Sequence, residues 1–240
     1  MTNVIRTLDD IMHIYYINLE HRTDRKIHVE NQLNTIGIKG FNRFNAIKME
    51  NGAIGCSMSH LKILEEAYNN NWEHILIVED DITFLNPKLF VVQFEQFMTN
   101  QNQNKKKWDV VLFAGNNVPP YDVIDDTCIK VKRCQTTTGY LVNGHYIKTL
   151  MTNIKMGLHQ LITNPTRRDL FAIDRYWFSL QNVSKWYLIT PPTVIQCAGY
   201  SDIERKNTNF ERVMTDINKD YMFSNRDKDK DNNRFSLDFH

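Results

Sequence analysis

The chain has 240 residues, a length that suits one large α/β domain, with two small domains as the alternative. Its net charge of +1 excludes a global field that would attract nucleic acid or an anionic membrane. No apolar stretch approaches the roughly 20 residues that a membrane-spanning helix needs. Because Asp9 and Asp10 stand where a signal peptide would be apolar, we expect no leader and a cytoplasmic location.

The first half of the chain alternates patterns of strands and helices. Short apolar runs are typical of strands buried on both faces, and apolar residues three or four apart indicate helices. The order predicts an α/β fold with a mostly parallel central sheet flanked by helices. The predicted elements are a strand over 11–19, a helix over 20–36 closed by Gly37, a strand over 41–47, a helix over 57–71, a strand over 75–78, a helix over 87–98 and a strand over 108–114. The apolar residues expected to face inward are Ile27, Leu33 and Ile36 on the first helix and Leu61, Leu64 and Tyr68 on the second.

The second half is less regular. Its patterns predict a strand over 129–133 with a neighbour over 137–142, helices over 143–154 and 172–181, and strands over 186–189 and 193–196 separated by Pro191-Pro192. Apolar content falls from Arg205 onward. We therefore predict one domain over 1–204 and a polar tail over 205–240 that is partly flexible or wraps the domain.

Three adjacent carboxylates, Glu79-Asp80-Asp81, follow directly after the apolar run 74–78. Ligands of open α/β sheets bind beyond the carboxyl ends of such strands. The carboxylates repel one another unless a cation or a donor-rich ligand compensates them. Hard oxygen ligands suit Mg²⁺ or Mn²⁺, ions that usually hold a substrate phosphate as well. An acidic turn exposed to water is the alternative interpretation.

A second polar cluster follows the first predicted strand. Asn18 can hydrogen-bond a base or ribose edge, and Arg22 and Arg25 lie three apart near the start of the next helix. A guanidinium in that place suits a phosphate. The alternative is a pair of solvated arginines on a helix surface.

A third cluster is Gly52-x-x-Gly55-Cys56-x-x-Ser59-His60. Cys56 and His60 are four apart, which invites comparison with a nucleophile and its base. However, Cys56 has no nearby cation other than His60, and zinc would find only two soft ligands here. We therefore expect Cys56 to be a small core residue, and Ser59 and His60 to be polar groups at a phosphate or sugar pocket. All four cysteines are expected to be reduced, although Cys128 and Cys134 could face each other in a hairpin.

These stretches together resemble glycosyltransferase family 25, which includes bacterial lipooligosaccharide galactosyltransferases and collagen hydroxylysine galactosyltransferases. The matching motifs are INLEHRTDR (17–25), GAIGCSMSH (52–60) and VEDD (78–81), and fainter ones are TTTGYLVN (136–143), FAIDRYW (171–177) and QCAGYSDI (196–203). The resemblance covers roughly the first 205 residues. It implies a GT-A type fold and a nucleotide-sugar donor. The short chain looks more like a bacterial or large-DNA-virus member, which in the viral case would work in the host cytoplasm or virion.

The resemblance implies metal-dependent transfer of galactose or glucose from a UDP-sugar to a hydroxyl of an oligosaccharide or a collagen-like chain. Mn²⁺, with Mg²⁺ as the alternative ion, would be held by Glu79, Asp81 and Asp202, with Asp81 as the direct ligand. Asp174 is the candidate base, with apolar neighbours to raise its pKa and Tyr176-Trp177 to stack against a sugar ring. A helix N-cap is its alternative role. The residues expected to bind the donor are Asn18, Leu19, Arg22, Arg25, Ala46, Ser59, His60, Asp80, Thr138 and Tyr140.

Two other functions compete with transfer. An acidic strand end also serves metal-dependent phosphohydrolases and nucleotidyltransferases, and a catalytically silent sugar-binding module could use the same fold. The sequence leaves open the donor sugar, the acceptor, the stereochemistry and the oligomeric state, and predicts no nucleic-acid partner.

Overall fold

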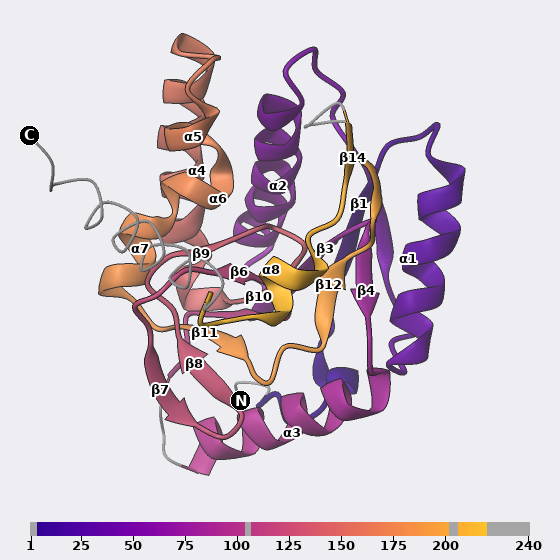
Figure 1. The fold of residues 1–240 in the computed structure, drawn as a ribbon, viewed down its shortest axis with the longest axis vertical. Helices are drawn as coiled ribbons and strands as arrows, with labels where there is room; N and C mark the ends of the chain where they lie inside the picture. Colours follow the sequence, from indigo (N-terminus) through magenta and orange to yellow (C-terminus); the bar gives the residue numbers. More distant parts are fainter. Residues whose placement is uncertain (1–3, 104–106, 202–205, 220–240) are drawn as a thin grey trace, which may run out of the picture.

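A mixed eight-stranded sheet forms the centre of the protein, in the order β2-β1-β3-β10-β5-β11-β8-β7 (Figure 1). The structure is a computed structural model that describes residues 4–103, 107–201 and 206–219. The strands of this sheet are β1 (Ile14–Asn18), β2 (Asn42–Asn45), β3 (His74–Glu79), β5 (Val110–Leu112), β7 (Asp122–Asp125), β8 (Cys128–Lys130), β10 (Gly139–Asn143) and β11 (Trp186–Ile189).

Strands β10 and β8 run against the other six, so the β2–β1, β1–β3 and β5–β11 pairings are parallel and the rest are antiparallel. The predicted α/β class with a large central sheet is confirmed. The pairing of the segments near 129–133 and 137–142 is different from the prediction. Strand β10 lies between β3 and β5, because Tyr140, Leu141 and Val142 are all fully buried and can fill an interior position on both faces.

Helices cover both faces of the sheet. Helices α1 and α3 pack on one face, where Leu76 and Val78 of β3 point, and α2 and α4 pack on the other, where Ile75 and Ile77 point. This alternation follows from the period of two along a strand. The helices are α1 (Thr23–Thr35), α2 (Gly52–Asn69), α3 (Pro87–Gln103) and α4 (Gly144–Thr163), with the short α5 (Arg168–Phe171), α6 (Ile173–Tyr176), α7 (Phe178–Val183) and α8 (Glu211–Thr215) and the 3-10 helix η1 (Leu8–Asp10).

Two predictions about inward-facing residues are wrong. Ile27 is 61% exposed and Tyr68 is 41% exposed, whereas Leu33 and Ile36 are buried as expected. On α1 the buried stripe passes through Val29 instead of Ile27, because residues four apart share a face with Leu33.

Helix α2 begins at Gly52, well before the predicted start at Ser57, because Asn51 caps it by accepting a hydrogen bond from the N–H of Ala53. A β-carbon at Gly55 would lie 2.3 Å from the carbonyl oxygen of Ile47. Only glycine therefore lets the first turn of α2 approach the chain that follows β2. The predicted helix over 172–181 is divided into α6 and α7 at Trp177, whose side chain is buried in the core.

Three two-stranded sheets lie outside the central sheet. They pair β4 (Ile82–Phe84) with β12 (Val194–Gln196), β6 (Asn116–Asn117) with β9 (Cys134–Gln135), and β13 (Gly199–Ser201) with β14 (Lys206–Thr208). The N–H of Cys197 donates to the carbonyl oxygen of Asp81 at 2.7 Å. This contact holds the chain after β12 against the end of β3.

The first part of the predicted tail packs against the domain. Met214 of α8 is fully buried and contacts β12 through the N–H of Gln196. The remainder of the predicted tail, from residue 220 onward, lies outside the described residues. All four cysteines are free, as predicted.

Candidate functional site

The three carboxylates after β3 do not converge on one point. Asp80 is held by one residue at the end of β1 and one in the first turn of α1. Asn18 Nδ2 donates to its Oδ2 at 2.7 Å, and Arg25 Nη1 donates to its Oδ1 at 3.1 Å. Arg25 also donates to Oδ2 of Asp81 at 3.4 Å and to the carbonyl oxygen of Tyr200 at 2.8 Å. The acidic turn is therefore tied to the start of α1 and to β13, and it is not a solvated loop.

One oxygen of Asp81 is available to a ligand. Its Oδ1 atom is buried and has no hydrogen-bond partner among the described residues. Burial, together with the negative charge of Glu79, raises the pKa of Asp81 to about 8, although Arg25 acts in the opposite direction. A buried carboxylate oxygen without a partner is costly, and a bound divalent cation would relieve that cost. The site therefore fits a hard metal ion.

The side chain of Glu79 contacts a different set of residues from those around Asp80 and Asp81. Its Oε1 atom accepts a hydrogen bond from Thr137 Oγ1 at 2.8 Å, and it lies 3.4 Å from His60 Nε2 and 3.6 Å from Cys56 Sγ. Burial would raise the pKa of Glu79, but its polar neighbours His60, Thr137 and Cys56 together lower it. Burial beside Glu79 holds the pKa of the Cys56 thiol well above its usual range. A thiol in this state is a poor nucleophile, as the sequence analysis expected.

A cavity of about 400 Å³, here termed the Arg25 cavity, opens beyond the ends of β1 and β3. Parallel strands place their carboxyl ends at the same edge, and this brings together side chains far apart in the sequence. Residues that the sequence analysis had not assigned, among them Lys48 and Glu50, complete its wall. The predicted site residues that line it are Asn18, Leu19, Arg25, Ala46, Ser59, Glu79, Asp80 and Asp81.

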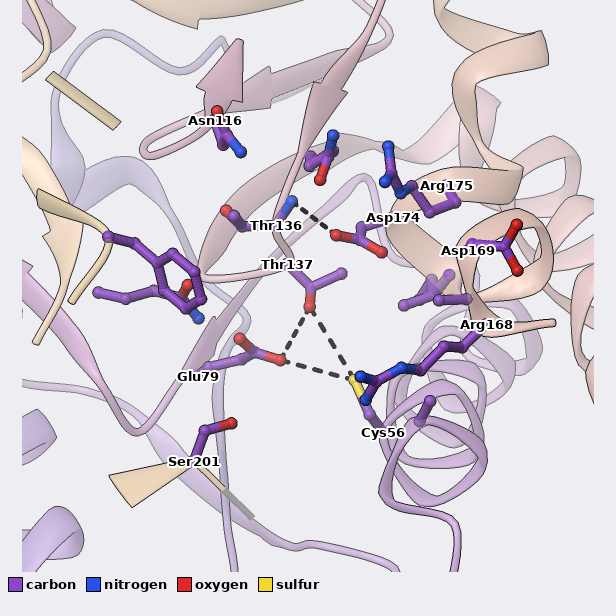
Figure 2. Close-up of a pocket in the computed structure, with 16 residues that line it drawn as sticks. Cys56, Glu79, Asn116, Thr136, Thr137, Arg168, Asp169, Asp174, Arg175 and Ser201 are labelled. Atoms are coloured by element: carbon purple, nitrogen blue, oxygen red, sulfur yellow. Dashed lines mark hydrogen bonds between the residues drawn. The ribbon is translucent and has the colours of Figure 1, made fainter. Parts of the chain in front are cut away.

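A second cavity of about 390 Å³, here termed the Asp174 cavity, adjoins the first (Figure 2). Asp174 lies in the first turn of α6, and its Oδ2 accepts a hydrogen bond from the N–H of Thr136 at 3.1 Å. Thr136 adopts a φ of 79°, an uncommon conformation for a β-branched residue. Burial raises the pKa of Asp174, as predicted for a candidate base. The residues common to the two cavities are Cys56, Glu79, Gln196 and Ser201.

Several predicted site residues lie elsewhere. Thr138, directly before β10, and Tyr140, on this interior strand, are fully buried and line neither cavity. His60 is also fully buried and lines neither cavity, although its Nε2 lies 3.4 Å from Glu79. Arg22 pairs with Asp24 at 2.9 Å and borders a small neighbouring cavity.

Two further expectations concern Trp177 and Asp202. Trp177 cannot stack against a sugar, because it is fully buried and donates its ring N–H to the carbonyl oxygen of Cys134. Asp202 lies outside the described residues.

Most residues that line the Asp174 cavity were not predicted from the sequence. Arg168 and Arg175 flank Asp174 on the short helices α5 and α6, and Asn116 and Thr137 come from the opposite wall (Figure 2). The available signal was the run of three threonines before Gly139, which supplies Thr136 and Thr137. The sequence did not indicate that the two arginines line a cavity, because charged residues on short helices usually face water.

Comparison with known proteins agrees with the motifs. The family model "Glycosyltransferase family 25 (LPS biosynthesis protein)" matches residues 48–162. The resemblance to glycosyltransferase family 25 is confirmed. A "Glycosyltransferase 25 family member" from Aedes aegypti is 24% identical over 95% of this chain and 44% of its own length. A namesake from Anopheles gambiae is 29% identical over 59% of this chain and 28% of its own length.

A human relative described as "Inactive glycosyltransferase 25 family member 3" is 25% identical over 52% of this chain and 20% of its own length. The chain thus spans less than half the length of these family-25 relatives. Among solved structures, a glycosyltransferase "involved in the glycosylation of the major capsid of PBCV-1" is 12% identical, with a TM-score of 0.42, and the match covers 80% of this chain and 95% of that one. Of the helices in the described ranges, none has the length and apolarity needed to span a membrane.

Proposed function

We propose that this chain is a glycosyltransferase of the GT-A type that moves galactose or glucose from a UDP-sugar to an acceptor hydroxyl. The observation that carries the proposal is the pair of adjoining cavities with a shared wall, one containing Arg25 and Asp81 and the other containing Asp174. Transfer between two substrates requires that both be held in contact at their reacting atoms. The family-25 match supports the same reaction class.

The Arg25 cavity is the proposed donor site. Arg25 would meet a phosphate with its guanidinium, and Asn18, in the wall of the same cavity, would contact a ribose or base. Asp81 would hold Mn²⁺, or Mg²⁺ as the alternative, through its unpartnered oxygen, with Asp202 as a further proposed ligand. Glu79, the third ligand expected from the sequence, turns instead toward Cys56 and His60. When bound, such an ion would supply Lewis-acid stabilisation of the departing diphosphate.

The Asp174 cavity is the proposed acceptor site. The raised pKa of Asp174 suits a group that takes a proton from an acceptor hydroxyl near neutral pH. The Thr136 N–H holds one carboxylate oxygen and so fixes the direction of the carboxyl group. The proposed acceptor is an oligosaccharide or hydroxylysine on a collagen-like chain, with inversion at the sugar carbon.

The test is a UDP-release assay with UDP-galactose and UDP-glucose in the presence of Mn²⁺, with and without oligosaccharide and collagen-peptide acceptors. We expect release that depends on both the acceptor and the metal, and loss of activity in excess chelator. Acceptor-independent hydrolysis, or release of pyrophosphate, would instead indicate a phosphohydrolase or a nucleotidyltransferase. Full activity after confirmed metal removal would contradict the metal assignment.

A catalytically silent sugar-binding module is the second candidate. The description of the human relative as inactive favours it, and that match includes about half of this chain. In this case calorimetry would detect UDP binding, while no acceptor would support turnover.

A further inference from the structure

Three side chains with metal-ligand atoms meet at the wall between the two cavities. Cys56 and His60 stand one turn apart on α2, and Glu79 ends β3. Cys56 Sγ, a ring nitrogen of His60 and a carboxylate oxygen of Glu79 all lie within 4.8 Å of one another. From the sequence only the first two could be paired, and the fold supplies the third.

Two of the three spacings between these atoms match the edges of a zinc tetrahedron, and the third, from Cys56 Sγ to the His60 nitrogen, is within 4.8 Å. Zinc bonds of about 2.3 Å to sulfur and about 2.0–2.1 Å to nitrogen and oxygen set tetrahedral edges of about 3.5 Å for sulfur to oxygen and about 3.3 Å for nitrogen to oxygen. The corresponding distances are 3.6 Å from Cys56 Sγ to Glu79 Oε1 and 3.4 Å from His60 Nε2 to the same oxygen. The second distance is long for an N–H···O hydrogen bond. Two of the three edges therefore already have the lengths that a bound zinc ion requires.

The surroundings hold the ligands in place. His60 Nδ1 lies 2.8 Å from the hydroxyl oxygen of Tyr140, which can accept a hydrogen bond from the Nδ1–H and leave Nε2 free to bind a metal. Thr137 Oγ1 donates to Glu79 Oε1 at 2.8 Å. His60 and Tyr140 are fully buried, so neither ring can turn easily. Buried partners of this kind orient the first ligands in known zinc sites.

We propose that Cys56, His60 and Glu79 form a Zn²⁺ site whose fourth position opens to water or to a substrate oxygen. The open position follows from the geometry, because Cys56 and Glu79 line both cavities. Three protein ligands with an exchangeable fourth are typical of catalytic zinc and not of structural zinc. A thiolate and an imidazole select zinc over Mg²⁺ or Mn²⁺, so this site is chemically distinct from the oxygen ligands of Asp81. Binding converts the Cys56 thiol to a thiolate and releases its proton to solvent.

The first test uses the full chain, stripped with chelator, desalted and titrated with ZnCl₂ or CoCl₂. We expect one tightly bound Zn²⁺ per chain by calorimetry and elemental analysis. The cobalt form should show a thiolate-to-cobalt charge-transfer band and the intense visible bands of a tetrahedral ion. Cys56→Ser should abolish the charge-transfer band, whereas Cys197→Ser, the matched half-buried cysteine, should retain it. Tyr140→Phe should weaken zinc binding by about 10–100-fold. Binding that is unchanged in Cys56→Ser would overturn the proposal.

A second test needs no change at the ligands. Stoichiometric Zn²⁺ should protect Cys56 of the unmodified chain from alkylation, as read by mass spectrometry of its peptide, and should leave Cys197 reactive. Asp81→Asn should retain the bound zinc even if it loses Mn²⁺-dependent turnover, so failure of the proposed function and failure of this site give different results. If no zinc remains after desalting and Cys56 reacts equally with and without the ion, the cluster is only a hydrogen-bonded group and the proposal is wrong.

Discussion

The Arg25 cavity and the Asp174 cavity share a wall, but the charged groups in them have different neighbours. In the Arg25 cavity Asp80 and Asp81 both pair with one guanidinium, while burial and the nearby charge of Glu79 raise the pKa of Asp81 to about 8. In the Asp174 cavity one half-buried carboxylate is held by a backbone N–H. The first arrangement suits a ligand that brings phosphates and a cation, and the second suits a group that accepts a proton. Two carboxyl groups with raised pKa values can therefore have different roles, set by their neighbours.

The largest effect should follow from Asp81→Asn, which keeps the size of the side chain but removes the metal-binding charge. We expect transfer to fall below detection in a UDP-release assay. The pKa of about 8 lies above the 3.8 of an ordinary aspartate, so the folded chain binds more protons than the unfolded chain between these pH values. The free energy of unfolding should therefore fall as pH rises through this window. Asp81→Asn has no titrating carboxyl group at this position, so its stability should not fall for this reason.

A thermal melt in chelator at pH 8 checks this stability prediction. The variant should melt at the same temperature as the parent or higher. A collapse of the fold would mean that Asp81 is a structural residue, and transfer near the parental rate would remove it from the proposed donor site.

Asp174→Asn should slow transfer by about 10²–10⁴-fold and leave the affinity for the UDP-sugar nearly unchanged, because the amide cannot take up the acceptor's proton. Single-turnover kinetics and calorimetry measure the two quantities separately. Asp169→Asn is the matched control: this exposed carboxylate lines the same cavity but pairs with Arg167. If Asp174→Asn keeps the parental rate and the control does not, Asp169 is the better candidate for the base. If donor binding is lost together with turnover, Asp174 belongs to the nucleotide-sugar pocket.

Arg25→Ala should weaken UDP binding by about 1–3 kcal/mol, the range of charge-assisted hydrogen bonds. Arg22→Ala is a close control, since Arg22 pairs with the exposed Asp24 and lies outside the Arg25 cavity. Calorimetry should therefore give a smaller effect for Arg22→Ala. Equal losses of UDP affinity in the two variants would show that the net charge at the start of α1, and not hydrogen bonds from the Arg25 guanidinium, attracts the phosphate.

The smallest predicted effect is a pH dependence. The proposed base works in its ionised form, and burial raises the pKa of Asp174. The transfer rate at saturating substrates should therefore decline with acidification at a pH above the ordinary 3.8 of an aspartate, by about tenfold per unit once the group is mostly protonated. The measurement is a pH–rate profile for the parent and for Asp174→Asn. An identical decline in the variant would assign the titration to another group.

The Arg25 cavity could be predicted from the sequence because its parts follow strand ends directly. Asn18 follows the apolar residues of β1, and Glu79 to Asp81 follow those of β3, so the parallel arrangement brings them to one edge. Asp174 was found through a motif, but its neighbours Asn116 and Thr137 come from strands whose pairing the sequence did not indicate. Asp202 stays a prediction.

Apolar spacing and glycines predicted most strands of the central sheet, the four long helices and the position of the acidic triplet, because these patterns act within one element. The position of β10 between β3 and β5 emerged only in the folded chain, since the two edges of a buried strand can pair with many neighbours. The tertiary structure also decided that Glu79 turns toward Cys56 and His60 while Asp81 turns toward Arg25. The direction of each carboxylate depends on which partners from distant segments offer hydrogen bonds and charge, and spacing along the chain does not encode those partners.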